Sequence, residues 1–316
     1  MSTVKNYLSL VKFSHTIFAM PFAMIGFFLG VKYPGRLHGD VVIFNLNQTI
    51  NGAYDFGELL IKFFLVVGCM IFARSAAMAF NRYLDRNFDA KNPRTAIREI
   101  PAGIISKQSA LRFVIFNCIA FVTCTFFINK TCFFLSPVAL FIVLGYSYTK
   151  RFTPLCHLIL GLGLSLAPIG AFLAVTGIFA LLPVLFSLTV IFWVSGFDII
   201  YALQDEEFDK SEKLYSMPSW LGKSKALRVS EFLHLLSAVC VVIAGIYGEF
   251  GIWYWIGVVI FAGMLIYQHS IVKPNDLRRV NLAFMTANGI ASVVFAVFVI
   301  TDLQIYPHHF LQSITP

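Results

Sequence analysis

Charged side chains are scarce in this sequence. They make up 13% of its 316 residues, whereas a soluble domain has about 25%, and hydrophobic residues reach 58% with a mean hydropathy of +0.78. This shortage of charge excludes an ordinary soluble domain and indicates a membrane protein. The chain also lacks any Cys-x-x-Cys motif, so we expect neither a disulfide framework nor a zinc site. The six cysteines, interpreted as small buried hydrophobic residues, are Cys69, Cys118, Cys124, Cys132, Cys156 and Cys240.

Apolar runs of membrane-spanning length, about 17–25 residues, recur along the chain. No small-residue cleavage site follows the first run, so we expect a retained helix and not a signal peptide. The boundary between the third and fourth runs consists only of Asn129 and Lys130. We predict an all-α polytopic membrane protein with nine transmembrane helices, forming a single domain over residues 1–316. The predicted spans are approximately 13–31, 59–80, 112–128, 132–149, 155–175, 179–197, 230–247, 251–271 and 281–300.

The distribution of basic residues predicts the orientation of the bundle. If the N-terminus is cytoplasmic and nine helices alternate, the inner segments, with Arg112 at the end of one of them, hold 19 of the 24 Lys and Arg residues. This asymmetry obeys the positive-inside rule, so we expect the N-terminus inside. The net charge of +8 then follows from the topology, and nucleic-acid binding is not expected. The inner segments are 1–12, 81–111, 150–154, 198–229 and 272–280.

Two clusters of acidic residues stand out, because carboxylates are costly at the edge of a membrane bundle. The first follows the second predicted span and consists of Asn81, Asp85 and Asp89. The second follows the sixth span and consists of Asp198, Tyr201, Asp205 and Asp209. Their spacings place each cluster on one face of a helix that continues past the membrane. We therefore expect two aspartate-rich cytoplasmic loops over a central cavity.

The two clusters suggest a site for a divalent metal ion. Carboxylates spaced four residues apart repel each other unless a cation lies between them. Mg²⁺ prefers such oxygen ligands and often shares its coordination shell with substrate phosphates. Nearby basic residues suit phosphate binding, Arg as a bidentate donor and Lys as a point charge. They are Arg82, Arg86, Lys91, Arg94, Arg98, Lys150 and Arg151. The alternative is that all these residues are solvated charges beside the membrane.

At these residues the sequence resembles the UbiA superfamily of membrane aromatic prenyltransferases. It is most similar to bacterial 4-hydroxybenzoate polyprenyltransferases and to the UbiA-like enzymes of menaquinone synthesis. The resemblance extends from about residue 10 to 300. One departure is Arg82, which stands where many members have a second acidic residue. Further similar blocks are Ser14–Pro21, Lys91–Thr95, Arg98–Gly103, Tyr146–Arg151 and Tyr215–Pro218.

The resemblance implies a role for each motif residue. Asn81, Asp85, Asp89, Asp205 and Asp209 would bind Mg²⁺. Arg94, Lys150 and Arg151 would contact the diphosphate of the prenyl donor. The catalytic centre would include Asp85, Asp198, Tyr146 and Tyr201. The implied reaction ionises an allylic diphosphate, and a ring carbon of an electron-rich aromatic acid attacks the resulting cation.

Several alternatives stay open from the sequence alone. The acceptor is expected to be 4-hydroxybenzoate, with a dihydroxynaphthoate of menaquinone synthesis as the alternative. A cation or metabolite transporter and a non-catalytic scaffold are the competing classes of protein. Arg74, within the second span, either contacts a substrate anion or forms a structural ion pair. The expected partners are a polyprenyl diphosphate, a small aromatic acid and the lipid of a bacterial inner membrane; oligomeric state and prenyl chain length are not predicted.

Overall fold

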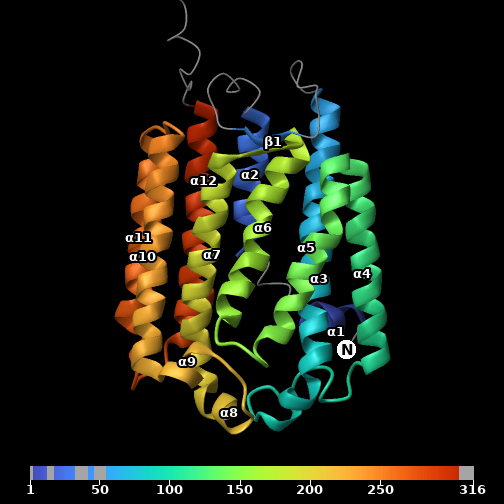
Figure 1. The fold of residues 1–316 in the computed structure, drawn as a ribbon, viewed down its shortest axis with the longest axis vertical. Coiled ribbons are helices and arrows are strands. Elements are labelled where there is room, and N and C mark those ends of the chain that lie inside the picture. The colour runs from blue at the N-terminus through green and yellow to red at the C-terminus, as the bar shows by residue number, and fades with distance from the viewer. Residues whose placement is uncertain (1–2, 13–17, 33–41, 46–54, 306–316) are drawn as a thin grey trace, which may run out of the picture.

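The computed structural model describes residues 3–12, 18–32, 42–45 and 55–305. Within these residues, eight helical segments have the length and the apolar composition needed to cross a membrane. They stand side by side as an elongated bundle (Figure 1), which confirms an all-α, multi-pass membrane protein. The eight are α3 (Phe56–Lys91), α4 (Lys107–Ile128), α5 (Lys130–Thr149), α6 (Cys156–Thr176), α7 (Leu181–Ala202), α10 (Lys223–Tyr247), α11 (Ile252–Ile271) and the π-helical turn η4 (Leu282–Ala287) with α12 (Asn288–Ile305).

The first predicted span corresponds to a shorter helix, α2 (Met20–Lys32), which has 13 residues. Residues 13–17 of that span, and most of the outer loop 34–58, lie outside the described residues. The predicted count of nine helices is therefore approximate, because the described residues contain eight helices of membrane-spanning length and the shorter apolar helix α2.

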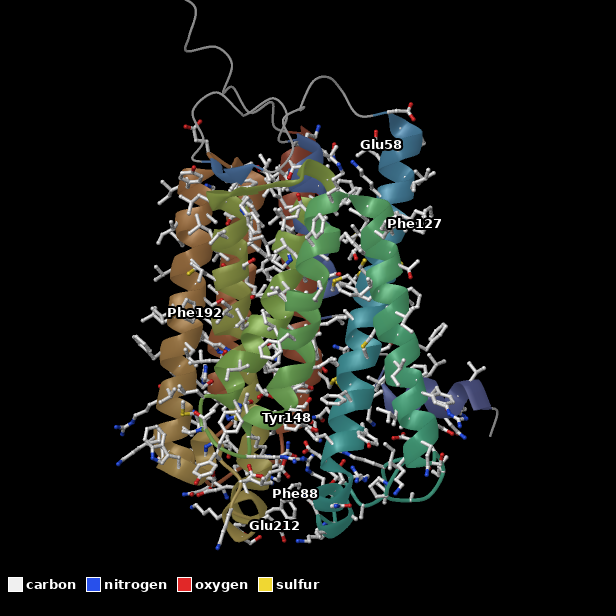
Figure 2. All side chains as sticks on the ribbon, turned by 45° about the vertical axis from the view of Figure 1, so that its right-hand side comes forward. Glu58, Phe88, Phe127, Tyr148, Phe192 and Glu212 are labelled. Carbon is white, nitrogen blue, oxygen red and sulfur yellow. The ribbon has the colours of Figure 1, made fainter. Side chains whose placement is uncertain are left out.

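Short elements close the two ends of the bundle. A two-stranded antiparallel sheet joins β1 (Val42–Asn45) to β2 (Ile178–Ala180) at one end. The opposite end carries α8 (Glu206–Ser211), α9 (Met217–Leu221) and, at its side, α1 (Thr3–Leu10) (Figure 1). Glu58 lies at the first end, whereas Phe88 and Glu212 lie at the second (Figure 2). Both predicted aspartate clusters are therefore at the α8 end.

Helix α3 is long enough to carry the first cluster beyond the membrane. Its 36 residues extend about 54 Å, compared with a hydrocarbon core about 30 Å thick. The helix begins where the Asp55 side chain accepts hydrogen bonds from the backbone N–H groups of Gly57 and Glu58. It ends at Lys91, because Pro93 disfavours helical geometry in the residue before it, and Asn92 is extended.

Asn129 accounts for the break between α4 and α5. Its side-chain oxygen accepts a hydrogen bond from the N–H of Cys132 at 2.8 Å and caps α5. Its side-chain nitrogen donates to the carbonyl of Leu173 at 2.8 Å and ties this turn to α6. The boundary predicted from only two polar residues is thus confirmed, and Asn129 fixes it.

One part of the bundle has a tightly packed aromatic core, and the other part surrounds a cavity. Helices α2, α7, α11 and α12 pack around buried aromatic rings, including Phe22, Trp193, Phe261 and Phe295. Because lipid is as apolar as these rings, close van der Waals packing between them stabilises this part of the bundle, and removal of apolar surface from water does not. Helices α3 to α6 instead surround a cavity, and α4 and α5 expose many phenylalanines, such as Phe127, on their outer faces. These outer faces suit contact with lipid.

The α2–α6 contact leads to a test of the packing. A Cβ on Gly26 would lie 2.0 Å from the backbone oxygen of Pro168. We expect Gly26→Ala to destabilise the protein by about 1–3 kcal/mol and lower its melting temperature in detergent. Gly145→Ala in α5 is the control, since a Cβ there meets nothing within 4 Å. Equal melting temperatures for the two variants would contradict this close approach of α2 to α6.

Candidate active site

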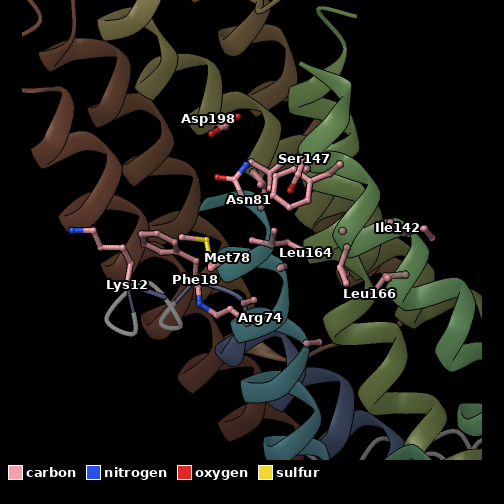
Figure 3. Close-up of a pocket in the computed structure, with 18 of the residues that line it drawn as sticks. Lys12, Phe18, Arg74, Met78, Asn81, Ile142, Ser147, Leu164, Leu166 and Asp198 are labelled. Carbon is pink, nitrogen blue, oxygen red and sulfur yellow. The ribbon is translucent and has the colours of Figure 1, made fainter. Parts of the chain in front are cut away.

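The first acidic cluster lies on one face of α3, as its spacing predicts. Asn81, Asp85 and Asp89 all line the cavity. The side-chain nitrogen of Asn81 donates to Oδ2 of Asp85 at 3.2 Å, so these two residues orient each other. Figure 3 shows Asn81 at the cavity together with Arg74, which lies seven residues earlier on α3.

The second cluster does not lie on one continuous helix, which corrects the expectation from its spacing. Helix α7 ends at Ala202, a 3₁₀ turn (η3) follows at Leu203–Asp205, and α8 begins at Glu206. Asp198, Tyr201 and Asp205 line the cavity, whereas Asp209 is fully buried behind its wall. The tighter turn changes the helical phase, so the one-face relation ends near Asp205.

Four aspartates of the two clusters each form an ion pair with a basic residue. The pairs join Asp85 to Arg151 (3.1 Å), Asp89 to Arg98 (2.6 Å), Asp205 to Arg94, and Asp209 to Lys150 (2.7 Å). The basic partners come from the loop after α3 and from the end of α5. Carboxylates of both clusters thus lie at the α8 end of the bundle, where Glu212 also lies (Figure 2). An ion pair between Lys91 and Glu212 (2.6 Å) joins the end of α3 to the loop after α8.

Arg94 and Lys150 are held in their charged forms. Arg94 contacts both oxygens of Asp205, and its Nη1 donates to the hydroxyl of Tyr201 at 3.0 Å. Burial alone would lower the pKa of Arg94, but Asp205 more than compensates and the pKa is raised above its usual value. Burial would likewise lower the pKa of Lys150, whereas Asp209 raises it. Both residues are therefore permanent cations at neutral pH.

The acidic residues fit a divalent cation by chemistry. Among the described residues, no three His, Cys, Asp or Glu side chains are already gathered around one point, because each motif aspartate contacts a basic partner. Buried carboxylate oxygens still remain without hydrogen bonds, namely Oδ2 of Asp89 and Oδ2 of Asp209. An unsatisfied carboxylate oxygen is costly to bury and is the ligand type that Mg²⁺ prefers. The metal set stays a prediction.

The cavity has a volume of about 860 Å³ and two chemically different parts. The charged residues line the α8 end, and apolar side chains such as Val66, Met70, Leu135 and Ile142 line the part between α3, α5 and α6. Every predicted site residue except Asp209 contributes to its wall. The arrangement can hold a molecule with a polyanionic head and a long apolar tail.

Polar groups also line the interior of the cavity. Arg74 has no ion pair within the described part of the chain, and its Nε has no hydrogen-bond partner. A structural ion pair, one of the two expectations for this residue, is therefore not found. Tyr146 and Asp198 lie in the same wall. Arg82, the departure from the family pattern, is buried, and its Nε and Nη1 lack hydrogen-bond partners.

Sequence reasoning missed two residues that contact the motif aspartates. The side-chain nitrogen of Asn92 donates to Oδ1 of Asp205 at 3.1 Å. His157 hydrogen-bonds through Nδ1 to Oδ2 of Asp198 at 2.6 Å. Asn92 could have been found, because it lies in the block Lys91–Thr95 that resembles the UbiA superfamily. His157 could not, because it is a single histidine in an apolar run and belongs to no motif.

The comparison with known families decides among the classes of protein. Residues 52–290 match the model of the UbiA prenyltransferase family. The chain belongs to the UbiA prenyltransferase family. It is therefore a membrane prenyltransferase, and the transporter and scaffold alternatives are set aside. Within the UbiA family, a similar protein is a 4-hydroxybenzoate octaprenyltransferase of Francisella tularensis subsp. novicida, 28% identical over 273 residues, which cover 84% of this chain and 94% of that protein.

Solved structures of UbiA homologues share the fold. A homologue from Aeropyrum pernix K1, in its apo form, has a TM-score of 0.72 and 25% identity and covers 92% of this chain and 97% of its own. A homologue from Archaeoglobus fulgidus, bound to DMAPP and Mg²⁺, has a TM-score of 0.68 and 18% identity, with coverages of 95% and 100%. The similarity thus extends over nearly the whole bundle.

Proposed function

We propose that this UbiA-family enzyme transfers a polyprenyl group from an isoprenyl diphosphate to a ring carbon of a small aromatic acid, 4-hydroxybenzoate. The observation that carries the proposal is the division of one cavity into a charged end and an apolar interior. A diphosphate suits the first part and an isoprenoid chain suits the second. The Francisella relative named as a 4-hydroxybenzoate octaprenyltransferase supports this choice of acceptor.

The charged end would bind the diphosphate. Asn81, Asp85, Asp89 and Asp205, which line the cavity, would hold Mg²⁺, which when bound supplies positive charge to stabilise the leaving diphosphate. Asp209, predicted from the sequence as a further ligand, faces Lys150 and would hold that cation in position. The Archaeoglobus neighbour solved with DMAPP and Mg²⁺ supports this assignment. Arg94, Lys150 and Arg151 would donate hydrogen bonds to phosphate oxygens as the allylic C–O bond breaks and the diphosphate leaves with the electron pair.

The interior of the cavity would hold the allylic cation and the acceptor while the new C–C bond forms. Tyr146 and Tyr201 would line the reacting centre, and the face of Tyr146 would stabilise the allylic cation. The face of Tyr201 is occupied, because its ring packs on Phe284 and the Arg94 guanidinium lies over it. The apolar walls would exclude water that otherwise converts the cation to an alcohol. A ring carbon of the acceptor then forms the new C–C bond. Asp198 would accept the proton lost from that carbon, and the C–H electron pair would return to the ring.

The same proposal gives a location and an orientation. We infer a bacterial inner membrane, with the α8 end of the bundle and the N-terminus in the cytoplasm. The support is the excess of Lys and Arg in the segments at this end. Soluble acceptor and the head of the donor would then enter from the cytoplasm.

Purified protein in detergent tests the function directly. With Mg²⁺, geranyl diphosphate and 4-hydroxybenzoate we expect a prenylated acid, detected by mass spectrometry, and none after EDTA is added. Product with a dihydroxynaphthoate but not with 4-hydroxybenzoate would assign the enzyme to menaquinone synthesis instead. Folded protein without product on either acceptor would contradict the proposed acceptor class.

A further inference from the structure

His157 joins a helix terminus to the cavity through two hydrogen bonds. It lies in the first turn of α6, is 3% exposed, and contributes to the cavity wall. Its Nδ1 lies 2.6 Å from Oδ2 of Asp198 on α7. Its Nε2 accepts a hydrogen bond from the backbone N–H of Met217 at 3.2 Å. Both ring nitrogens therefore have partners on different elements.

These bonds determine where the ring proton lies. Because the N–H of Met217 donates to Nε2, that nitrogen must present its lone pair. The ring proton then belongs to Nδ1, which donates it to Asp198. Met217 is the first residue of α9, where a backbone N–H has no partner within the helix. Ser216 caps the same helix end, so the donor to His157 is held in place.

The pairing leaves one oxygen of Asp198 available to the cavity. Oδ2 is occupied by His157, while no donor among the described residues reaches Oδ1. The Asp198 side chain is 24% exposed and borders the cavity near Asn81 (Figure 3). A carboxylate held through one oxygen has a fixed orientation of the other, which is what a proton acceptor requires.

We infer that His157 is a positioning residue that holds Asp198 in the orientation for accepting the acceptor's proton. The inference rests on the proposed function. The ring C–H proton passes to Oδ1 of Asp198, its electron pair returns to the aromatic ring, and His157 keeps its own proton on Nδ1 throughout. The effect of His157 on the reaction is transmitted by Asp198.

A double-mutant cycle with Asp198→Asn tests this inference. His157→Leu removes both hydrogen bonds and should lower kcat by about 10–100-fold, as loss of an orienting partner does at comparable sites, with the KM of the prenyl donor unchanged. In the Asp198→Asn background the same change should cause no further loss. His157→Gln should keep most of the activity, because its amide offers one donor and one acceptor at similar positions.

A matched control comes from a second buried histidine. His234 bonds to His269 and to the Trp193 carbonyl, away from the cavity. His234→Leu should lower the melting temperature without changing kcat per folded protein. Equal losses from His157→Leu in both Asp198 backgrounds, or no loss in the wild-type background, would overturn the inference.

A measurement without turnover separates this inference from the choice of acceptor. In protein labelled with ¹⁵N-histidine, the His157 ring should show a protonated Nδ1 and an unprotonated Nε2, and Asp198→Asn should shift the Nδ1 signal. Protonation at Nε2 would overturn the inference even if the enzyme is active. The expected tautomer in a protein that prenylates no aromatic acid would instead point to failure of the proposed function.

Discussion

Asp205→Ala should lower the kcat of prenyl transfer by about 10²–10³-fold, the loss typical when one group that stabilises developing charge is removed. Asp205 joins the second cluster to the loop that follows α3. It accepts hydrogen bonds from Arg94 and from Asn92, which both come from the loop after α3. Its removal takes an oxygen ligand from the predicted metal set and also releases Arg94 from its position near Tyr201.

The measurement is a steady-state assay of product at several concentrations of Mg²⁺. If Asp205 is a metal ligand, the remaining activity should need more Mg²⁺ than the wild-type enzyme. Glu207→Ala is the control, since Glu207 is an exposed carboxylate in the adjacent helix α8. A variant at 205 that stays within about threefold of wild type, at unchanged Mg²⁺ dependence, would remove Asp205 from the predicted site.

Local periodicity explains why the first cluster could be predicted and the second only partly. The three residues of the first cluster lie on one uninterrupted helix, so a spacing of four residues translates directly into one face. The second cluster crosses the 3₁₀ turn at Leu203–Asp205, which no residue type in the sequence marks. Its last member, Asp209, consequently faces Lys150 and not the cavity.

Contacts between distant residues explain what the sequence could not show. Arg94 and Asp205 are 111 residues apart, and His157 and Asp198 are 41 apart. Hydropathy and the positive-inside rule predict which segments cross the membrane and on which side the charges gather. They do not predict which cation meets which carboxylate, because helix packing decides these pairs. The resemblance to the UbiA superfamily predicted which residues form the site, and the structure shows which of them contact one another.

Substitution of Arg74 should weaken binding of the aromatic acceptor, which is the second large effect that we expect. Its guanidinium lies in the cavity wall without an ion pair among the described residues, and Nε has no hydrogen bond. We expect it to bind the carboxylate of the aromatic acid, and a charge-assisted hydrogen bond of this kind is worth about 1.5–3 kcal/mol. Arg74→Gln should therefore raise the KM of the acceptor by about 10–100-fold and leave the KM of the prenyl donor unchanged.

The stability of a second variant at this position, Arg74→Met, distinguishes a binding role from a structural one. An unpaired buried charge disfavours the folded state until an anion binds, so Arg74→Met should raise the melting temperature of the substrate-free protein while it weakens acceptor binding. A structural ion-pair partner would give the opposite sign, since breaking a buried pair is destabilising. Adding 4-hydroxybenzoate should then raise the melting temperature of the wild-type protein and not that of Arg74→Met. A lower melting temperature for the variant, or an unchanged acceptor KM in Arg74→Gln, would rule out this role.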